Sequence, residues 1–443
     1  RIFYVRRPEM ETAEEKLSFI ASHPMRDIGF DEVQPDKNAN WVNLTNNDFE
    51  TLIPLASKET KAAKTNRDVK AIFRKFSLGV VTARDEWVYD FDAALVAQKV
   101  RFLIDEYNAE RKRLKGELRE RQGLENRIAY RIKWSRAVKG DLSRSVTYSY
   151  VPDCMITSEY RPFLRQRLYF NKQLNEMQYL LREIFGPGQG SRCICISGIP
   201  AAKPFQTLAL ESVPSYDFLE KTQILPLFRY EMGQRIDNIT DWALKQFTAH
   251  YANDIGKGKA ARKITKEAIF HYCYAVLHDP VYREKYAQNL KREFPRMPLY
   301  AGFWQWAQWG EQLMALHIGY EAVQPFSLPR TDVPDAKARA AGQSPKPILK
   351  ADPASGSIAL DSETTLRGVP PEAWAYKLGN RCAIDWVLDQ HKEKKPKDPT
   401  IREKFNTYRF CDYKEKVVDL LMRVTTVSVE TVRITDAMKV ATR

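Results

Sequence analysis

Signals for the start and end of helices recur along residues 238–320, and they constrain the fold of this chain more strongly than any other feature. Asp237 or Asn238 can cap a first helix, and Thr265 can cap a second, which stops where a proline follows Asp279. The same Asp-Pro pair can start another helix, because proline fits the first helical position. The segment is therefore predicted to be a run of separately capped helices.

Strand signals occupy much of the chain before this run. Residues 192–197 and 223–230 read as short core strands, and residues 80–92 carry three aromatic side chains at alternate positions, typical of a half-buried strand. After the helical run, a hairpin is predicted around residues 352–356, and helices are predicted over most of residues 363–443. These patterns predict a mixed α+β fold with strand-containing domains, long helices and a helical C-terminal region.

The predicted domain organisation has four parts. Residues 1–145 form an N-terminal part ending in long basic helices, residues 146–325 form a central α/β part, residues 326–362 form a linker and hairpin, and residues 363–443 form the helical C-terminal region. The chain opens at Arg1, inside a strand-like run and without a methionine, so we expect a fragment whose N-terminal partner domains are missing.

Net charge indicates the class of partner to consider first. The chain carries 70 Lys and Arg against 56 Asp and Glu, a formal charge of +14, which favours an acidic polymer. Nucleic acid is favoured over a membrane, because no apolar run reaches the roughly 18 residues of a spanning helix. Six cysteines without framework spacing, and no recognisable signal peptide, predict a cytoplasmic location.

The stretch that begins at Ile156 mixes cationic and aromatic side chains. Arg161, Arg165 and Arg167 lie among tyrosines and phenylalanines, a mixture that suits a surface facing phosphates and bases. The alternative is that the aromatic residues are strand and core residues, while the arginines merely solvate the face. The sequence of this stretch leaves both interpretations open.

A second basic segment runs from Glu110 to Arg144 and includes Lys133 and Arg136 beside Trp134. A charged run is often only a solvated face. The excess of one sign here also fits contact with phosphates.

Two weak patterns suggest a catalytic alternative. Asp352 opens a glycine-containing turn similar to the S-adenosylmethionine loop of adenine methyltransferases, but a strand pattern follows it and the chain has no Asn-Pro-Pro-Tyr motif. Asp36, Glu59 and Lys61 have the residue types of a magnesium nuclease, types that recur by chance in a chain this charged. With no Walker A loop and no Gly-x-Ser-x-Gly elbow either, the residues favour a binding unit over a catalyst.

Two further clusters allow other interpretations. His271, Cys273 and His278 have metal-binding side chains, but no fourth ligand is near in sequence, so a buried core is predicted instead of a zinc site. The tryptophans within residues 304–309 leave a protein-interaction scaffold as a third alternative.

Several longer motifs occur in one order along the chain. They are Gly79-Val-Val-Thr-Ala-Arg84-Asp85, Ile132-Lys-Trp134-Ser135, Tyr160-Arg-Pro-Phe163 with Leu168-Tyr-Phe170, Tyr272 to His278 continuing through Tyr282 to Tyr286 and Phe294-Pro295, and Gly368 to Gln390. Together they resemble the C-terminal half of type ISP restriction-modification enzymes, over most of residues 70–435. Enzymes of this bacterial defence family combine a restriction nuclease, an ATP-driven helicase-like DNA translocase, a coupler, an N6-adenine methyltransferase and a C-terminal target recognition domain.

The resemblance implies that this chain is the target recognition region of such an enzyme. It then recognises a specific sequence in double-stranded DNA, and its partners are the methyltransferase and translocase domains of the same polypeptide. S-adenosylmethionine, ATP and Mg²⁺ belong to the full-length enzyme, and no cofactor or metal is expected in this chain. The chain itself is expected to be non-catalytic.

Charged residues of these motifs and of the basic stretches are the expected DNA contacts. They are Arg84, Asp85, Lys133, Arg136, Arg161, Arg165 and Arg167, with Asp85 expected to orient Arg84. Arginine can pair two donors with guanine, whereas lysine more often fixes the register on phosphates. The alternative for each residue is an intramolecular salt bridge that holds the fold.

Overall fold

The computed structural model describes most of the chain. The described residues are 1–8, 11–35, 41, 45, 47–59, 69–115, 123–186, 190–252 and 262–443. They divide into two compact units, Arg1–Phe49 and Glu50–Arg443. The four-part organisation expected from the sequence stays a prediction.

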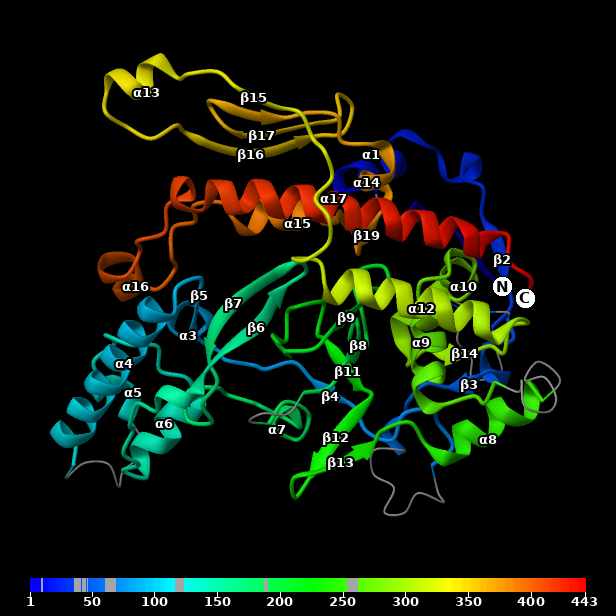
Figure 1. The fold of residues 1–443 in the computed structure, drawn as a ribbon, viewed down its shortest axis with the longest axis horizontal. Helices are drawn as coiled ribbons and strands as arrows, with labels where there is room; N and C mark the ends of the chain where they lie inside the picture. The colour runs from blue at the N-terminus through cyan, green and yellow to red at the C-terminus, as the bar shows by residue number, and fades with distance from the viewer. Residues whose placement is uncertain are drawn as a thin grey trace. The chain divides into compact units, whose positions relative to one another are not determined.

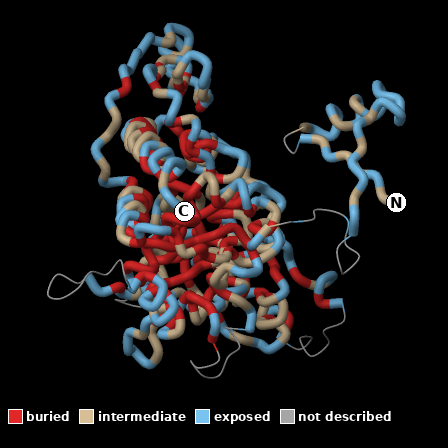
Figure 2. Tube along the Cα trace, turned by 90° about the vertical axis from the view of Figure 1, so that its right-hand side faces the viewer, coloured by how far each residue is buried: buried red, intermediate tan, exposed pale blue. Residues whose placement is uncertain are grey.

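The described residues of the Arg1–Phe49 unit form one antiparallel strand pair and one α-helix. Its elements are β1 (Ile2–Tyr4), α1 (Ala13–Ser22), a 3-10 turn (Met25–Asp27) and β2 (Asp31–Val33), which pairs with β1. α1 begins at Ala13 because Thr12 caps it: the Thr12 side chain accepts from the Glu15 N–H, and the Glu15 carboxylate accepts from the Thr12 N–H. No residue of α1 is buried, whereas the Glu50–Arg443 unit contains a large buried core (Figure 2).

One four-stranded sheet of the larger unit carries the arginine-rich stretch (Figure 1). Its strands are β5 (Tyr89–Asp90), β6 (Met155–Arg161), β7 (Leu164–Tyr169) and β10 (Val213–Pro214), in the order β10-β6-β7-β5. β7 is antiparallel to both neighbours, and β10 is parallel to β6. Phe163, Leu168 and Phe170 are buried, so these apolar side chains belong to the core.

A second sheet is antiparallel and almost wholly buried. Its strands are β4 (Ser77–Leu78), β8 (Cys193–Ile196), β9 (Thr207–Leu210) and β11 (Gln223–Pro226), in the order β4-β11-β8-β9. All residues of β8 and β9 are buried, which confirms the predicted core strand at Cys193. A hairpin of β12 (Phe228–Glu231) and β13 (Gln234–Asp237) follows β11.

The segment 80–92 differs from its prediction as a strand. It forms a short helix, α3 (Asp85–Val88), before the two residues of β5. Trp87 and Val88 are both buried. In a half-buried strand, successive side chains point to opposite faces, so one of these two would be exposed. Asp92 caps α4 (Ala93–Arg113) as predicted, accepting from the Ala94 N–H at 2.8 Å.

The helices predicted over residues 238–320 are present, with one different cap. They are α8 (Asp241–His250), α9 (Lys266–Val276), α10 (Pro280–Lys285), α11 (Ala287–Arg292) and α12 (Phe303–Ile318). Thr265 and Asp279 cap α9 and α10 as predicted. Thr240 caps α8, because the Asn238 amide is already bonded to the backbone of Lys75 and Pro226.

α9 and α12 cross at close range in the core. A Cβ on Gly310 of α12 would lie 1.8 Å from the His271 carbonyl oxygen, so only glycine permits this approach. His271, Cys273 and His278 are buried, which confirms their interpretation as core residues. Burial also raises the pKa of the Cys273 thiol, which disfavours the thiolate that a metal would need.

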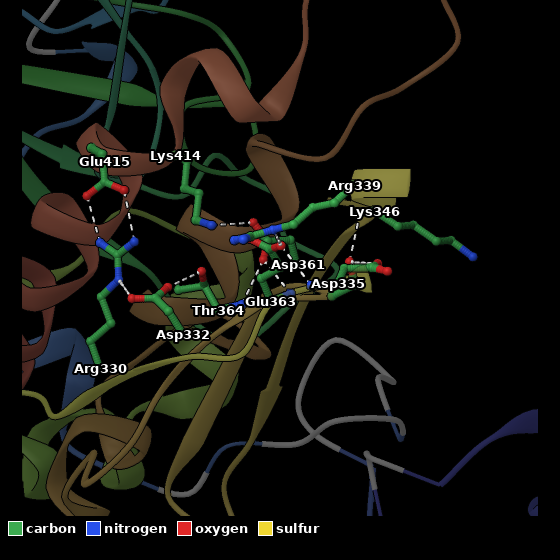
Figure 3. A network of polar contacts seen from close by, with 11 residues as sticks. Arg330, Asp332, Asp335, Arg339, Lys346, Asp361, Glu363, Thr364, Lys414 and Glu415 are labelled. Atoms are coloured by element: carbon green, nitrogen blue, oxygen red, sulfur yellow. Dashed lines mark hydrogen bonds and ion pairs between the residues drawn. The ribbon is translucent and has the colours of Figure 1, made fainter. Parts of the chain in front are cut away.

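A third four-stranded sheet lies against the long C-terminal helix α17 (Phe410–Lys439). Its strands are β15 (Arg330–Asp332), β16 (Pro347–Asp352), β17 (Ser357–Asp361) and β18 (Thr364–Leu366), in the antiparallel order β15-β18-β17-β16. Arg330 pairs with Glu415 of α17 at 2.7 Å, and Asp361 pairs with Lys414 at 2.7 Å (Figure 3). The β16–β17 hairpin was predicted from the sequence, and these ion pairs fix its sheet to the start of α17.

Further short helices and strands belong to the described part of the larger unit. They are β3 (Ile53–Pro54), which pairs with β14 (Arg296–Met297), α5 (Leu124–Arg127), α6 (Arg136–Ser143), α7 (Leu181–Ile184), α13 (Ala336–Ala340), α14 (Pro371–Ala375), the pair β19 (Lys377–Leu378) and β20 (Arg381–Cys382), α15 (Ala383–Gln390) and α16 (Pro399–Lys404). The basic run from Glu110 to Arg144 is thus divided among the end of α4, α5 and α6. The helices expected after residue 363 are present as α14, α15 and α17.

A buried polar cluster joins α9, α12 and α17. The His317 ring is hydrogen-bonded to the Tyr274 hydroxyl at 2.6 Å and to the Thr431 hydroxyl at 2.9 Å. Burial, helped by the nearby Arg283 cation, lowers the pKa of His317 from 6.5 to about 3. His317 is therefore neutral in the folded chain at neutral pH.

The low pKa of His317 predicts acid sensitivity. The unfolded chain takes up this proton near pH 6.5 and the folded chain only near pH 3, so the stabilisation is present above pH 6.5 and is lost as the pH falls. Between pH 7 and pH 5 this group alone should cost about 2 kcal/mol of unfolding free energy. Urea denaturation of the wild-type chain and of His317→Gln at pH 7 and pH 5 measures this cost. Between the two pH values the variant should lose about 2 kcal/mol less unfolding free energy than the wild-type chain. Equal losses in both proteins would contradict the assignment.

Candidate functional site

The motif from Gly79 to Asp85 links β4 of one sheet to α3 and β5 of the other. Val80 donates to the Pro214 carbonyl oxygen, and Val81 exchanges backbone hydrogen bonds with Met177, so the motif is held on both sides. A Cβ on Gly79 would lie 2.3 Å from the Ser215 carbonyl oxygen, so this crossing requires glycine.

Arg84 points into the protein. Its side chain is 0% exposed and its guanidinium donates to the Ser135 hydroxyl and, at 3.3 Å, to the Leu174 carbonyl oxygen. The Glu176 carboxylate lies 3.9 Å away and accepts a hydrogen bond from Ser135 at 2.6 Å. Burial lowers the pKa of Arg84, although Glu176 opposes this. Arg84 thus fastens the start of α6 to the Gly79–Asp85 motif.

Asp85 does not orient Arg84, which corrects the expectation from the sequence. Its carboxylate accepts hydrogen bonds from the Thr82 hydroxyl and, at 3.2 Å, from the Tyr160 hydroxyl. Burial raises the pKa of Tyr160, which keeps its hydroxyl protonated as the donor. Asp85 therefore ties the start of α3 to the end of β6.

A first cleft, of about 670 Å³, opens beside Asp85. Tyr130 and Tyr216 line it as exposed or half-buried aromatic side chains, and Lys133 and Lys397 line it as cations. Lys133 is exposed and has no hydrogen bond or ion pair to any residue that the structure describes. The first cleft thus combines aromatic surfaces with cations.

A second cleft, of about 370 Å³, adjoins the first, because Asp85 and Glu86 line both. Arg161, Gln166 and Asn406 contribute polar side chains to it. Further cations come from a segment we call the lysine loop, residues 391–397. They are Lys392, Lys394 and Lys395, all exposed.

The lysine loop is fixed to α3. The Glu86 carboxylate accepts from the Lys397 N–H and the Asp398 N–H, both at 2.9 Å, and the Trp87 indole donates to Asp398 at 2.8 Å. Asp398 also caps α16. At the other end of the loop, the Glu393 carboxylate accepts from the backbone N–H at the start of α17. The backbone that carries these lysines is therefore held in a defined position between the two clefts.

Four of the expected DNA contacts line these clefts. Arg84 and Lys133 line the first cleft, Arg161 lines the second, and Asp85 lines both. Arg161 donates to the Ser215 hydroxyl at 3.0 Å, and its guanidinium lies 4.1 Å from the Tyr160 ring centroid. Arg136 is exposed in the first turn of α6. The DNA contacts expected of all these residues stay predictions.

Arg165 and Arg167 lie elsewhere. Strand alternation places them on the face of β7 opposite Gln166, which lines the second cleft. Arg165 pairs with Glu159 at 2.7 Å and Glu321 at 2.6 Å, and Arg167 donates to the Thr157 hydroxyl at 2.8 Å. For Arg165 in particular, the structure shows the intramolecular salt bridge that was the alternative.

The lysine loop was missed by the sequence analysis. Its signal is present: four lysines occur within six residues, with Pro396 among them, and Asp398-Pro399, a helix start, follows directly. A basic loop of this kind is easily dismissed as a solvated connection between helices. The loop belongs to the candidate site because it is anchored to α3, which is far away in the sequence.

The catalytic alternatives gain no support from the described residues. Asp36 and Lys61 lie outside them, and Glu59 is exposed. Asp352 lies in the β16–β17 turn, where Ser355 donates to its carboxylate at 2.6 Å and thereby lowers the pKa of Asp352. Within the described ranges, no three His, Cys, Asp or Glu side chains gather as metal ligands would.

The model of the type ISP C-terminal specificity domain family matches residues 71–420, which include all the lining residues of both clefts. The chain belongs to this family. The resemblance found in the sequence motifs is therefore confirmed, and the mixed α+β fold agrees with it. No described helix of this specificity domain is long and apolar enough to cross a membrane.

Solved structures that resemble this specificity domain include the following three. A DrdV–DNA complex, determined by cryo-EM, is 49% identical with a TM-score of 0.88, covering 100% of this chain and 43% of that chain. A nuclease-deletion mutant of the type ISP restriction-modification enzyme LlaGI, in complex with a DNA substrate mimic, is 25% identical with a TM-score of 0.77, covering 96% and 38%. The ATP-dependent type ISP enzyme LlaBIII bound to DNA is 22% identical with a TM-score of 0.73, covering 92% and 25%, and shows the shared fold. Among curated protein sequences, none is significantly similar to this chain.

Proposed function

We propose that this specificity domain recognises a particular sequence in double-stranded DNA on behalf of a longer restriction-modification enzyme. The chain spans 43% of the DrdV chain and 38% of the LlaGI chain that it matches, and both of those proteins were determined with DNA or a DNA mimic. The remaining length accommodates the methyltransferase and translocase domains, which we propose as partners in the same cytoplasmic polypeptide. S-adenosylmethionine, ATP and Mg²⁺ would act in those domains.

The anchored lysine loop is the observation that carries this proposal. Lys394, Lys395 and Lys397 are exposed cations, and the bonds of Glu86 and Trp87 to the end of the loop remove much of the entropy that a flexible loop would lose on binding. Lys133 adds a cation at the first cleft. Lysines held in this way suit the phosphates of a duplex, which position the protein without reading its sequence.

The second cleft supplies side chains that can read bases. Gln166 and Asn406 line it, and neither side-chain amide has a hydrogen-bond partner among the described residues. Amides of this kind can bind adenine through two hydrogen bonds in the major groove. Arg161 lies in the same cleft with one terminal nitrogen already engaged. We assign base reading to these three residues and phosphate contact to the lysines.

Selection from a pool of randomised duplexes tests the proposal. The full chain should enrich one motif and bind it roughly 10³-fold or more tightly than a scrambled duplex. Fluorescence anisotropy over a salt series should show affinity falling with salt, with a slope of log Kd of about 0.9 per phosphate contact. Equal affinity for every duplex at all salt concentrations would remove the claim of sequence recognition.

A further inference from the structure

The Arg1–Phe49 unit has almost no buried core of its own. Among its described residues only Phe49 is buried, and its sheet consists of two strands of three residues each. A strand pair of this size is at best marginally stable in water and needs further strands or a packed helix. The unit therefore needs apolar contacts beyond those made among its described residues.

One side of α1 carries apolar side chains that could make such contacts. Ala13, Leu17, Ile20 and Ala21 follow one another at spacings of four, three and one, which places them on one side of the helix. All four are exposed, and the exposed fractions of Leu17 and Ile20 are 66% and 62%. We call these four residues the α1 stripe.

The rest of α1 shows that the helix is amphipathic. Glu15, Ser18 and Ser22 lie on the side opposite the α1 stripe and are exposed. Phe19 lies between the two sides and contacts the N-terminal segment, because the Arg7 guanidinium lies 3.8 Å from its ring centroid. An amphipathic helix normally turns its apolar side to protein and its polar side to water. The α1 stripe therefore has the chemistry of a buried helix face, although it is exposed in this chain.

The position of the α1 stripe in the sequence points to a partner outside this chain. Residues 71–420 match a family described as a C-terminal domain, and the Arg1–Phe49 unit lies before the matched residues. This chain aligns over 100% of its own length with 43% of the DrdV chain, so the DrdV chain contains a counterpart of the unit together with a larger remainder. A C-terminal domain follows the remainder of its polypeptide, and the Arg1–Phe49 unit is the part of this chain nearest to that remainder in sequence.

We infer that the α1 stripe docks on the domain that directly precedes this chain in the longer enzyme. The inference rests on the proposed function only in requiring that longer polypeptide. The docking partner presents an apolar groove, in which Leu17 and Ile20 are anchors one turn apart on the helix. Their burial there supplies the apolar contacts that the unit lacks. The Arg1–Phe49 unit then belongs structurally to the preceding domain, although it lies outside that domain in sequence.

Photo-cross-linking of the longer enzyme tests this docking. Ile20→p-benzoylphenylalanine places the reactive group on the α1 stripe, and Ser18→p-benzoylphenylalanine is the matched control on the exposed opposite side of the same helix. Mass spectrometry should identify cross-links from position 20 to residues that precede Arg1, and position 18 should form none of these. Cross-links from position 20 to residues 50–443, or to a second copy in a mixed-isotope sample, would overturn the inference. So would the absence of any cross-link that position 18 does not also form.

Leu17→Ser and Ile20→Ser combined give a second readout. In the 443-residue chain they should leave the thermal unfolding midpoint unchanged, because both side chains are exposed there, whereas in the longer enzyme they should lower it. An equal effect in both proteins, whether a loss or none, contradicts the docking.

The selection of duplexes tests the proposed function separately. A chain that selects no DNA motif but cross-links as expected keeps the docking and loses the proposed recognition of DNA. A chain that selects a motif but cross-links only within residues 50–443 loses the docking alone. If the natural polypeptide has no domain before Arg1, the docking is wrong, and duplex selection still decides the recognition of DNA.

Discussion

The Arg84→Ala variant should be less stable than the wild-type chain by about 3 to 5 kcal/mol, the range typical of removing one partner of a buried ion pair. The substitution leaves the Leu174 carbonyl oxygen without a donor and removes the cation beside Glu176. It also releases the Ser135 contact that joins the start of α6 to the Gly79–Asp85 motif. Urea denaturation measures the loss directly.

Arg136→Ala is the matched control, because Arg136 is an exposed arginine of the neighbouring α6. Its stability should change by no more than about 0.5 kcal/mol. If Arg84→Ala proves as stable as Arg136→Ala and instead loses DNA affinity, then Arg84 contacts DNA, and the structural role that we assign to it is wrong.

Replacing Lys394, Lys395 and Lys397 with alanine should weaken duplex binding about 500-fold at 0.1 M salt. Each phosphate contact contributes about 0.9 to the slope of log Kd against log salt concentration. Three contacts therefore contribute roughly 2.7 log units of affinity when the salt falls from 1 M to 0.1 M. The salt slope itself should fall by about 2.7. Stability should change little, because these side chains are exposed and the anchors of the loop are its backbone and Asp398.

The control replaces Lys337, Lys346 and Lys350 of the β15–β18 region, which are also exposed and carry the same total charge. Anisotropy titrations of both triple variants separate local contact from net charge. Similar losses in both would show that the lysine loop acts only through net charge, and the proposed DNA-binding surface would then be wrong.

Local sequence signals predicted the helices well. Asp92, Thr265 and Asp279 cap the helices that were expected to start at them, because a cap depends on residues within one turn. Gly310 shows a limit of this local approach. Its requirement for glycine comes from His271 on another helix, which no local pattern reveals.

The site was harder to predict, because its side chains are oriented by residues distant in sequence. Arg84 is oriented by Ser135 and Glu176, so a motif arginine expected to contact DNA turns inward. The lysine loop is held by Glu86 and Trp87, more than 300 positions earlier, so its role was invisible in its own residues. The composition predicted nucleic acid as the class of partner. Tertiary contacts decide which cations are available to bind such a partner.

Lysine acetylation, followed by mass spectrometry with and without a saturating duplex, tests the proposed DNA-binding surface most directly. Lys133, Lys394, Lys395 and Lys397 should become several-fold less reactive when DNA is bound, while Lys337 should react equally in both states. Unchanged reactivity of the lysine loop on a chain that is shown to hold DNA would contradict the account.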